Sequence, residues 1–354
     1  MIPSPQAVVR ARPFQGVRVR GPVSATGLVA GSFGLLLGVA VLAVLLGTEV
    51  ASPARALADP ASLDRVILVS VRLPRVALAA LAGGGLAVVG AAFQALLRNP
   101  LAEPYILGVS GGAALGATCA IALGLGVSGI LGAALIPGAA LAGGLGATLL
   151  VYGIARGADG SSGTSILLAG VMVNAIAAAL ITFLKTLVSP SRAQQLLRWL
   201  TGFIDLPTSA GLAAAAVYVA GGCAVLLADA ARLNLLSLGD ESAEALGLNV
   251  RGLERRVFFA SSCVVGAIVS LTGLIGFIGL VVPHALRRLV GPDHRVLLPM
   301  SIALGAAALV GCDLGARLLF RWLGTEPPVG AVTAILGGPA FLVLLRRGAR
   351  SSSD

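Results

Sequence analysis

Charged residues are scarce in this sequence, at 11% of its 354 residues, whereas a soluble domain carries about 25%. Aromatic residues make up only 4%, while hydrophobic residues reach 57% and 48 residues are glycine. This composition excludes a soluble globular domain and indicates an integral membrane protein. The apolar runs are continuous, which excludes the short alternating segments of a transmembrane barrel. We therefore predict an all-α polytopic membrane protein whose helices approach closely through small side chains.

Residues that commonly hold metals or carry out catalysis are also few. The four cysteines stand singly in apolar runs, which indicates packing rather than a disulfide or metal site. They are Cys119, Cys223, Cys263 and Cys312. The two histidines, His284 and His294, offer little to an intramembrane enzyme. The single lysine, Lys185, lacks the Gly-Lys-Ser/Thr context of a phosphate-binding loop, so this chain has no ATPase motif of its own.

Ten apolar runs approach or reach the length of a membrane span. They cover residues 27–47, 76–97, 105–127, 130–154, 165–187, 210–229, 257–272, 274–290, 296–320 and 329–345. Between two of them, residues 188–209 with Trp199 indicate a short helix at the membrane surface. We predict one transmembrane domain over residues 27–347, and a polar outside loop at 48–71. A basic cytoplasmic tail is expected at 1–26, and a short cytoplasmic tail at 348–354.

The net charge of +10 follows from the positions of the basic residues. They lie between apolar runs, as the positive-inside rule requires, and form no patch for nucleic acid. The stretch 257–290 is long for one span and short for two. Two crossings place 16 of the 25 basic residues in the cytoplasm, and one crossing places 12 there. We therefore predict two crossings, ten spans and both termini in the cytoplasm.

Residues 72–113 combine a membrane-length apolar run with polar groups at both ends. Arg72 and Arg75 precede the run, and a proline-rich elbow from Arg98 to Pro104 follows it. Charges and prolines between membrane-length segments are costly unless they meet water or a partner. This stretch is therefore a candidate for function.

The loop at 233–250 carries the signals of a short helix. Asp240 is predicted to cap it and Gly247 to end it, while Ala243 and Leu246 share one face. Such a helix either connects two spans or docks a cytoplasmic partner.

A second unusual segment covers residues 272–288. Glycine recurs there at every third position, which allows backbones to approach closely. Pro283 is expected to interrupt the helix near its inner end. His284 beside it fits a structural role better than a catalytic one.

In this order, the motifs resemble the membrane subunit of the FecCD-type ABC importers, which take up iron–siderophore complexes, haem and vitamin B12. The matching pieces are RLPR at 72–75, Gln94, RNPLAEPYILGVSGGA at 98–113, LLAGV at 167–171, Trp199 with Gly202, LNLLSLGDESAEALGLNV at 233–250, GLIGFIGLVVPH at 273–284, GPDHRVLLP at 291–299, Asp313, Arg317, PVG at 328–330 and GGPAFLVLLRR at 337–347. The resemblance covers roughly residues 27–347. Pro327 stands where leucine is usual, and the tail at 1–26 is longer than typical.

The resemblance implies a type II ABC importer permease fold with about ten transmembrane helices, in the cytoplasmic (inner) membrane. It implies a homodimer with the substrate path on the dimer axis, two separate ATP-binding subunits inside and a substrate-binding protein outside. Neither a cofactor nor nucleic acid is expected. The substrate expected first is an iron(III)–siderophore complex or haem, with cobalamin as the alternative.

Residue roles follow from the matching motifs. By resemblance, Arg72, Arg75 and Arg317 meet carboxylates of the binding protein. Alternatively they are snorkelling anchors, and Asp313 pairs with Arg317 one turn away. The residues expected to contact the ATPase are Asp240, Glu241, Ser242, Ala243, Leu246 and Gly247. Those expected on the translocation path are Asn99, Pro100, Ser110 and Asn174.

An ion-coupled secondary transporter is the other class of function that we consider. Such transporters usually bind the coupling ion through ionisable residues near the membrane midplane. Here Glu103, Asp229 and Asp313 all lie near predicted span ends. The sequence therefore favours an energy source on another chain.

Overall fold

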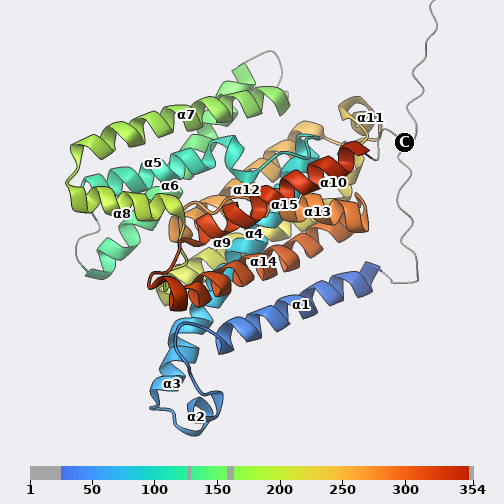
Figure 1. Cartoon of the computed structure of the whole chain (residues 1–354). Coiled ribbons are helices and arrows are strands. Elements are labelled where there is room, and N and C mark those ends of the chain that lie inside the picture. The colour runs from blue at the N-terminus through green and yellow to red at the C-terminus, as the bar shows by residue number, and fades with distance from the viewer. Residues whose placement is uncertain (1–24, 126–128, 158–162, 351–354) are drawn as a thin grey trace, which may run out of the picture.

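The computed structural model describes residues 25–125, 129–157 and 163–350, and every regular element in these ranges is a helix (Figure 1). The predicted tails therefore lie outside the described residues except at 25–26 and 348–350, which are helical. The long helices are α1 (Ala25–Leu45), α4 (Leu73–Leu96), α5 (Val109–Ala122), α6 (Gly129–Gly157), α7 (Gly163–Leu187), α9 (Ser209–Ala228), α12 (Val250–Thr272), α13 (Ile278–Val290), α14 (His294–Leu323) and α15 (Val329–Arg350). The short ones are α2 (Pro53–Ala58), α3 (Leu63–Arg65), the π-helical η1 (Val66–Arg72), the 3₁₀ turn η2 (Pro104–Leu107), α8 (Pro190–Thr201), α10 (Ala230–Leu236) and α11 (Asp240–Ala245).

Each of the ten long helices corresponds to one of the ten predicted spans, with different bounds at several ends. Seven described segments are long and apolar enough to cross a membrane by themselves. The other three predicted spans are α5 and α13, with 14 and 13 residues, and the apolar part of α15. At 1.5 Å per residue, a helix of this length spans about 20 Å, so α5 and α13 need the non-helical segments beside them to complete a crossing.

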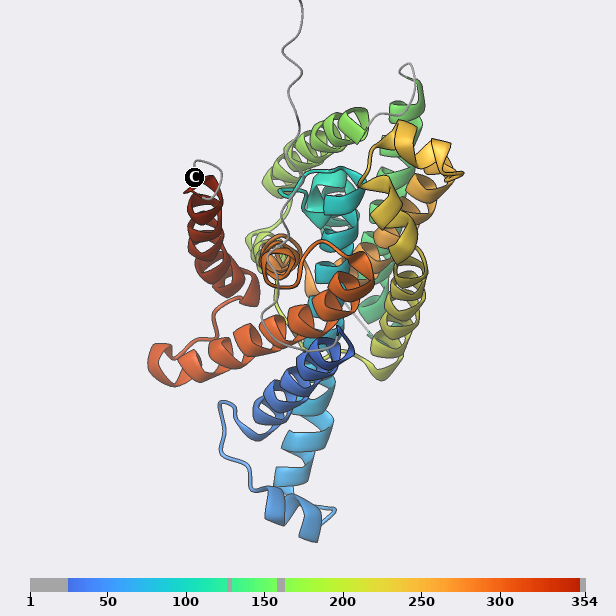
Figure 2. The same cartoon turned by 90° about the vertical axis from the view of Figure 1, so that its right-hand side faces the viewer.

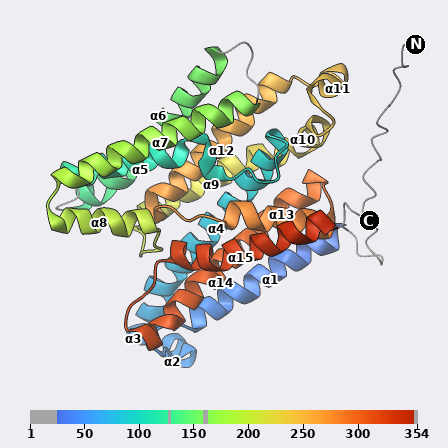
Figure 3. The same ribbon diagram turned by 45° about the horizontal axis from the view of Figure 1, so that its top comes forward.

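The bundle has two ends that differ in their short elements (Figures 1 and 3). We call one the α11 end, which carries α10, α11, the start of α1 and the end of α15. The other is the α8 end, which carries α8, α2 and α3. Figure 2 shows α15 standing at the edge of the bundle. Both described ends of the chain therefore lie on the same side of the bundle.

The predicted outside loop at 48–71 is wrong in its second half. Residues from Leu63 onward are helical, and η1 runs directly into α4. The wide π-helical turn precedes Pro74, which cannot donate a backbone hydrogen bond within a regular helix. The second span therefore begins about three turns before the predicted start at residue 76.

The helix α4 forms the centre of the bundle and is buried along most of its length. Glycines allow its neighbours to approach at backbone distance, as the composition predicts. A Cβ atom added to Gly83 would lie 2.3 Å from the carbonyl oxygen of Gly305 in α14. Gln94 also donates a hydrogen bond to the carbonyl of Leu280 in α13, at 3.2 Å. The apolar run of the 72–113 stretch is therefore the packing core of the fold.

Residues 273–277 are not helical, so the predicted span start at 274 is wrong. Both Gly273 and Phe277 have a positive φ, of +65° and +69°. Helix α12 starts at the α11 end and α14 starts there too, so residues 250–290 leave that end and return to it (Figure 1). This course agrees with the predicted two crossings.

Pro283 does not interrupt the helix, contrary to prediction, since α13 continues through it to Val290. A proline cannot bond to the carbonyl four residues earlier, which here belongs to Gly279. That oxygen faces α4 at Gly90, where an added Cβ would lie 1.7 Å from it. The absence of a side chain at Gly90 therefore leaves room for this carbonyl beside α4.

Candidate functional site

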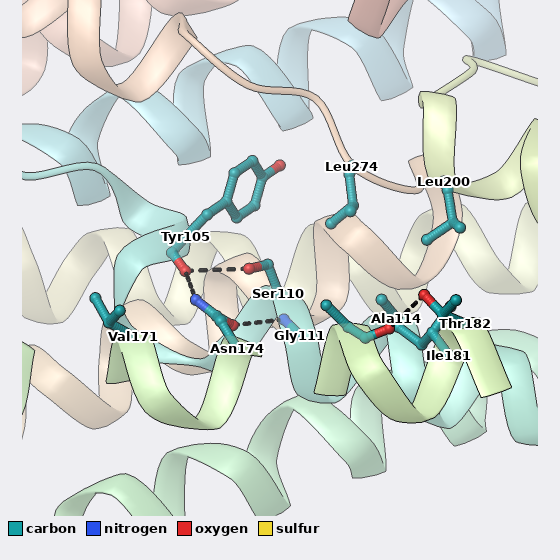
Figure 4. Close-up of a pocket in the computed structure, with 11 residues that line it drawn as sticks. Tyr105, Ser110, Gly111, Ala114, Val171, Asn174, Ile181, Thr182, Leu200 and Leu274 are labelled. Atoms are coloured by element: carbon teal, nitrogen blue, oxygen red, sulfur yellow. Dashed lines mark hydrogen bonds between the residues drawn. The ribbon is translucent and has the colours of Figure 1, made fainter. Parts of the chain in front are cut away.

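A cavity of about 570 Å³ opens between α5, α7, α8 and the non-helical segment after α12 (Figure 4). Two of the predicted path residues, Ser110 and Asn174, line it together. The complete lining is Tyr105, Ser110, Gly111, Ala114, Val171, Asn174, Ala178, Ile181, Thr182, Leu200 and Leu274. None of these side chains carries a charge. The wall is therefore uncharged, and most of its side chains are apolar.

The polar groups of this cavity are bonded to one another. The carbonyl oxygen of Tyr105 accepts hydrogen bonds from Ser110 Oγ at 3.1 Å and from Asn174 Nδ2 at 2.8 Å. The Oδ1 atom of Asn174 accepts one from the Gly111 N–H at 3.0 Å. These bonds fix the bend that precedes α5, so Asn174 and Ser110 shape the wall of the cavity.

The other two predicted path residues lie elsewhere. Asn99 and Pro100 form the turn after α4 at the α11 end, where Asn99 Oδ1 accepts from the Leu101 N–H at 2.9 Å. Neither lines the cavity, and the adjoining Arg98 forms an ion pair with Asp240 of α11. Their part in translocation remains a prediction.

Sequence reasoning missed the role of Glu103 and Tyr105. The Phe277 N–H donates to Glu103 Oε1 at 3.0 Å, and the Ile275 N–H donates to the Tyr105 hydroxyl at 3.1 Å. Non-helical backbone at membrane depth must find its partners within the protein. The sequence signal for this role was the presence of two polar residues, Glu103 and Tyr105, within AEPY at 102–105.

The helix break at residues 273–277 also contacts α15. A Cβ atom added to Gly337 would lie 2.6 Å from the Cβ of Phe277, so only glycine fits there. One turn further along α15, the ring of Phe341 meets the ring of His284 edge-on, with centroids 5.6 Å apart. This contact and the 8% exposure of His284 agree with its predicted structural role. The elbow, the helix break and α15 therefore form one connected unit.

Replacing Glu103 by leucine should lower stability and transport together, because the Phe277 N–H then lacks an acceptor. An unpaired buried donor costs about 1–3 kcal/mol. Glu103→Gln retains an acceptor oxygen and should behave nearly as wild type. Thermal unfolding in detergent and uptake in proteoliposomes measure the two effects. Equal losses in both variants would show that the charge of Glu103, rather than its acceptor, is needed.

Two of the predicted docking arginines are 4% exposed and bind backbone carbonyls at the end of α1. Arg72 donates to the carbonyls of Val44 and Leu45, at 3.0 and 2.8 Å. Arg317 donates to those of Ala43 and Leu46, at 3.0 and 3.3 Å. The last carbonyls of a helix lack partners within it and carry the negative end of its dipole. These two arginines therefore hold the end of α1 against α4 and α14.

The third arginine, Arg75, joins the same cluster through a shared carboxylate. Asp313, which is completely buried, accepts from Arg75 at 2.8 Å and forms an ion pair with Arg317 at 3.0 Å. Arg75 also pairs with Glu326. The alternative that Asp313 pairs with Arg317 is thus realised. Contact with a binding protein remains a prediction for all three arginines.

The predicted short helix in the 233–250 loop is present as α11. Asp240 is its first residue rather than its cap, because Gly239 takes the cap position with a φ of +105° and the Asp240 carboxylate pairs with Arg98 instead. Gly247 ends the helix as predicted, with a φ of +82° and its N–H bonded to the Glu244 carbonyl at 2.9 Å.

The faces of α11 differ from prediction in one respect. Ala243 is completely buried whereas Leu246 is 62% exposed, so the two do not share one environment. Leu246 lies at the end of the helix, where the chain has already turned away. Leu238, at 59% exposure, lies before the helix. The remaining predicted contact residues, Glu241, Ser242 and Gly247, are exposed.

Ion pairs and hydrogen bonds hold this loop in place. Asp229 accepts from Arg256 at 3.0 Å, which joins the start of α10 to α12. Burial would raise the pKa of Asp229, but the hydrogen bonds from Arg256 and Arg232 lower it below its ordinary value. Asn234 Nδ2 donates to Asp293 at 2.7 Å, next to α14. The loop is therefore fixed to two spanning helices.

Membrane-length helices, a helix break supported from a second segment and a surface helix fixed at one end suit a transport permease. Comparison with known families agrees with this class. The profile of the FecCD transport family matches residues 35–347. The chain belongs to the FecCD transport family.

Individual relatives support the same assignment. The chain is 44% identical over 282 residues to the cobalamin import system permease protein BtuC of Halobacterium salinarum, covering 80% of this chain and 74% of that protein. It is 39% identical over 281 residues to the hemin transport system permease protein HmuU of Yersinia pestis, covering 79% and 83%.

A solved structure of an inward-facing metal-chelate type ABC transporter has the same fold. It matches with a TM-score of 0.81 and 30% identity, over 91% of this chain and 99% of that one. The predicted type II importer permease fold is thereby confirmed. The protein is a multi-pass membrane permease of an ABC importer, without catalytic activity of its own, and it works with ATPase and binding-protein partners.

Proposed function

We propose that this protein forms the translocation path of an ATP-driven importer for a large metal chelate. The candidates are an iron(III)–siderophore complex or haem, and cobalamin. The observation that carries this proposal is the match to the two permeases at 44% and 39% identity, one named for cobalamin and one for hemin. These identities are too close to select one substrate.

The composition of the cavity supports a division of labour between chains. Its lining has no charged side chain that could grip an iron centre or a propionate. We therefore propose that an extracytoplasmic binding protein selects the substrate. We also propose that two copies of this chain, with two ATP-binding subunits, make up the transporter in the inner membrane.

Uptake by proteoliposomes tests the proposal. Vesicles hold this chain and its ATP-binding subunit, and the binding protein is added outside with labelled cobalamin, haem or ferric siderophore. We expect uptake of one of the three that requires ATP and survives collapse of the ion gradients. Uptake that ignores ATP and stops with the gradient would instead establish a secondary transporter.

We further propose that the α11 end faces the cytoplasm and that α11 contacts the ATPase. Leu238 and Leu246, which are 59% and 62% exposed beside the acidic residues of α11, support this contact. Exposed apolar side chains favour a protein partner. Leu246→Asp should reduce co-purification of the ATPase by about tenfold or more, equivalent to about 1.4 kcal/mol. Leu57→Asp, in α2 at the other end with 83% exposure, is the matched control. Equal recovery of the ATPase with both variants would count against the contact.

Docking of the binding protein at the α8 end is the corresponding proposal for Arg72, Arg75 and Arg317. Arg75 is the most exposed of the three, with a side chain 16% exposed, whereas Arg72 and Arg317 are 4% exposed and support α1. Asp313 keeps Arg317 as its partner when Arg75 is replaced. Arg75→Gln combined with Glu326→Gln removes both charges of one pair, and Glu326→Gln alone is the control. We expect about tenfold weaker binding of the binding protein only in the double variant, with a reduced salt dependence. Unchanged affinity in the double variant would remove Arg75 from the docking site.

A further inference from the structure

A groove of about 560 Å³ lies on another face of the bundle, between α6, α9 and α12. It follows α9 from Ser209 to Tyr218, which corresponds to about 14 Å along the helix axis at 1.5 Å per residue. Its walls include Leu141, Ala214 and Ala267. Because α9 spans the membrane, the groove runs along the membrane normal. Tyr218 is 47% exposed, so the groove opens on the exterior of the bundle.

A second, polar cavity of about 330 Å³ adjoins this groove at the α8 end. Leu271 lines both cavities, and Ile136 of the polar cavity is followed directly by Pro137 of the groove. The polar cavity contains Arg198 and Asp205. The apolar groove and the charged pocket therefore meet at Leu271, at one end of the bundle.

The charged pocket presents one positive and one negative group. The Arg198 guanidinium and the Asp205 carboxylate lie 2.9 Å apart and remain 61% and 65% exposed. The guanidinium also stacks over the ring of Phe203, 4.9 Å from its centroid. Both groups belong to α8 and the segment after it, where Trp199 is typical of the membrane–water boundary. The pair thus lies at the level of lipid headgroups.

We propose that the groove and the pocket together bind one glycerophospholipid with an amine-bearing zwitterionic headgroup, such as phosphatidylethanolamine. An acyl chain fills the slot between α6, α9 and α12. The phosphate meets Arg198, whose forked guanidinium suits phosphate oxygens, and the ammonium meets Asp205. The observation that selects this occupant is charge complementarity, because an anionic lipid would leave Asp205 facing a like charge. A bound lipid would join α8 to the ends of α6 and α12.

Binding of defined lipids to the full-length protein tests the site. The delipidated protein in detergent is titrated with phosphatidylethanolamine, phosphatidylglycerol or phosphatidylcholine, and bound lipid is counted by native mass spectrometry. Wild type should bind phosphatidylethanolamine about tenfold more tightly than the other two, a difference of about 1.4 kcal/mol. Phosphatidylglycerol has no ammonium for Asp205, and the quaternary ammonium of phosphatidylcholine has no N–H to donate to its carboxylate. Asp205→Asn should abolish the preference over phosphatidylglycerol.

A substitution in the slot tests the position of the acyl chain. Ala214→Phe fills the groove and should weaken all three lipids by about tenfold or more. Ala220→Phe, exposed on the same helix and outside the groove, is the control. Equal binding of the three lipids by wild type would overturn the proposed headgroup. Unchanged binding in a folded Ala214→Phe protein would overturn the proposed slot. The wild-type comparison holds even if that variant does not fold.

Discussion

Replacing Asp313 by asparagine should destabilise the protein by about 3–5 kcal/mol, because breaking a buried ion pair leaves uncompensated charge in the interior. Asp313 is completely buried and is shared by Arg75 and Arg317, the latter 4% exposed. Without the carboxylate, two guanidinium groups repel each other at the junction of α1, α4 and α14. The midpoint of thermal or denaturant unfolding in detergent measures the loss.

Two further variants make this prediction specific. Arg55 forms an ion pair with Asp64, but its side chain is 75% exposed. Arg55→Gln should therefore cost no more than about 1 kcal/mol. Arg317→Gln added to Asp313→Asn should recover part of the stability, because it removes one of the two guanidinium groups left without the carboxylate. An Asp313→Asn protein as stable as the Arg55→Gln protein would refute the prediction.

Replacing Gly90 by alanine should also destabilise the protein, by about 3 kcal/mol or more, because overpacking forces apart two backbones in contact. The added Cβ would lie 1.7 Å from the Gly279 carbonyl oxygen, so α4 and α13 must separate. Transport should fall as well, since α13 continues from the supported helix break. Unfolding in detergent and uptake in proteoliposomes measure both effects.

A control variant, Gly221→Ala, and a suppressor variant, Pro283→Ala, test the same contact between Gly90 and Gly279. An added Cβ at Gly221 would meet nothing within 4 Å, so Gly221→Ala should be neutral or stabilising by up to about 1 kcal/mol. Pro283→Ala restores an N–H that can draw the Gly279 carbonyl back into α13. It should therefore partly rescue Gly90→Ala. If the Gly90→Ala protein matches the Gly221→Ala protein in stability, the two backbones do not have the close contact described above.

The candidate site was only partly predictable from the sequence. Ser110 and Asn174 lie in the cavity, whereas Asn99 and Pro100 lie in a turn at the α11 end. Ser110 and Asn174 stand inside predicted apolar runs, and Asn99 and Pro100 stand between two of them, but no local signal shows which of these positions face the cavity. Glu103 shows the same limit, since its partner Phe277 lies 174 residues further along the chain.

By itself, the sequence determined the class of protein, the ten helices and the short helix of the 233–250 loop. These properties depend on composition, on the length of apolar runs and on signals within a few residues, such as Gly247. Only the tertiary structure decided which arginines are buried, where the Gly279 carbonyl fits beside α4, and where residues 273–277 leave the helix. The physical reason is that each of these depends on a hydrogen bond, an ion pair or a backbone contact with a distant segment.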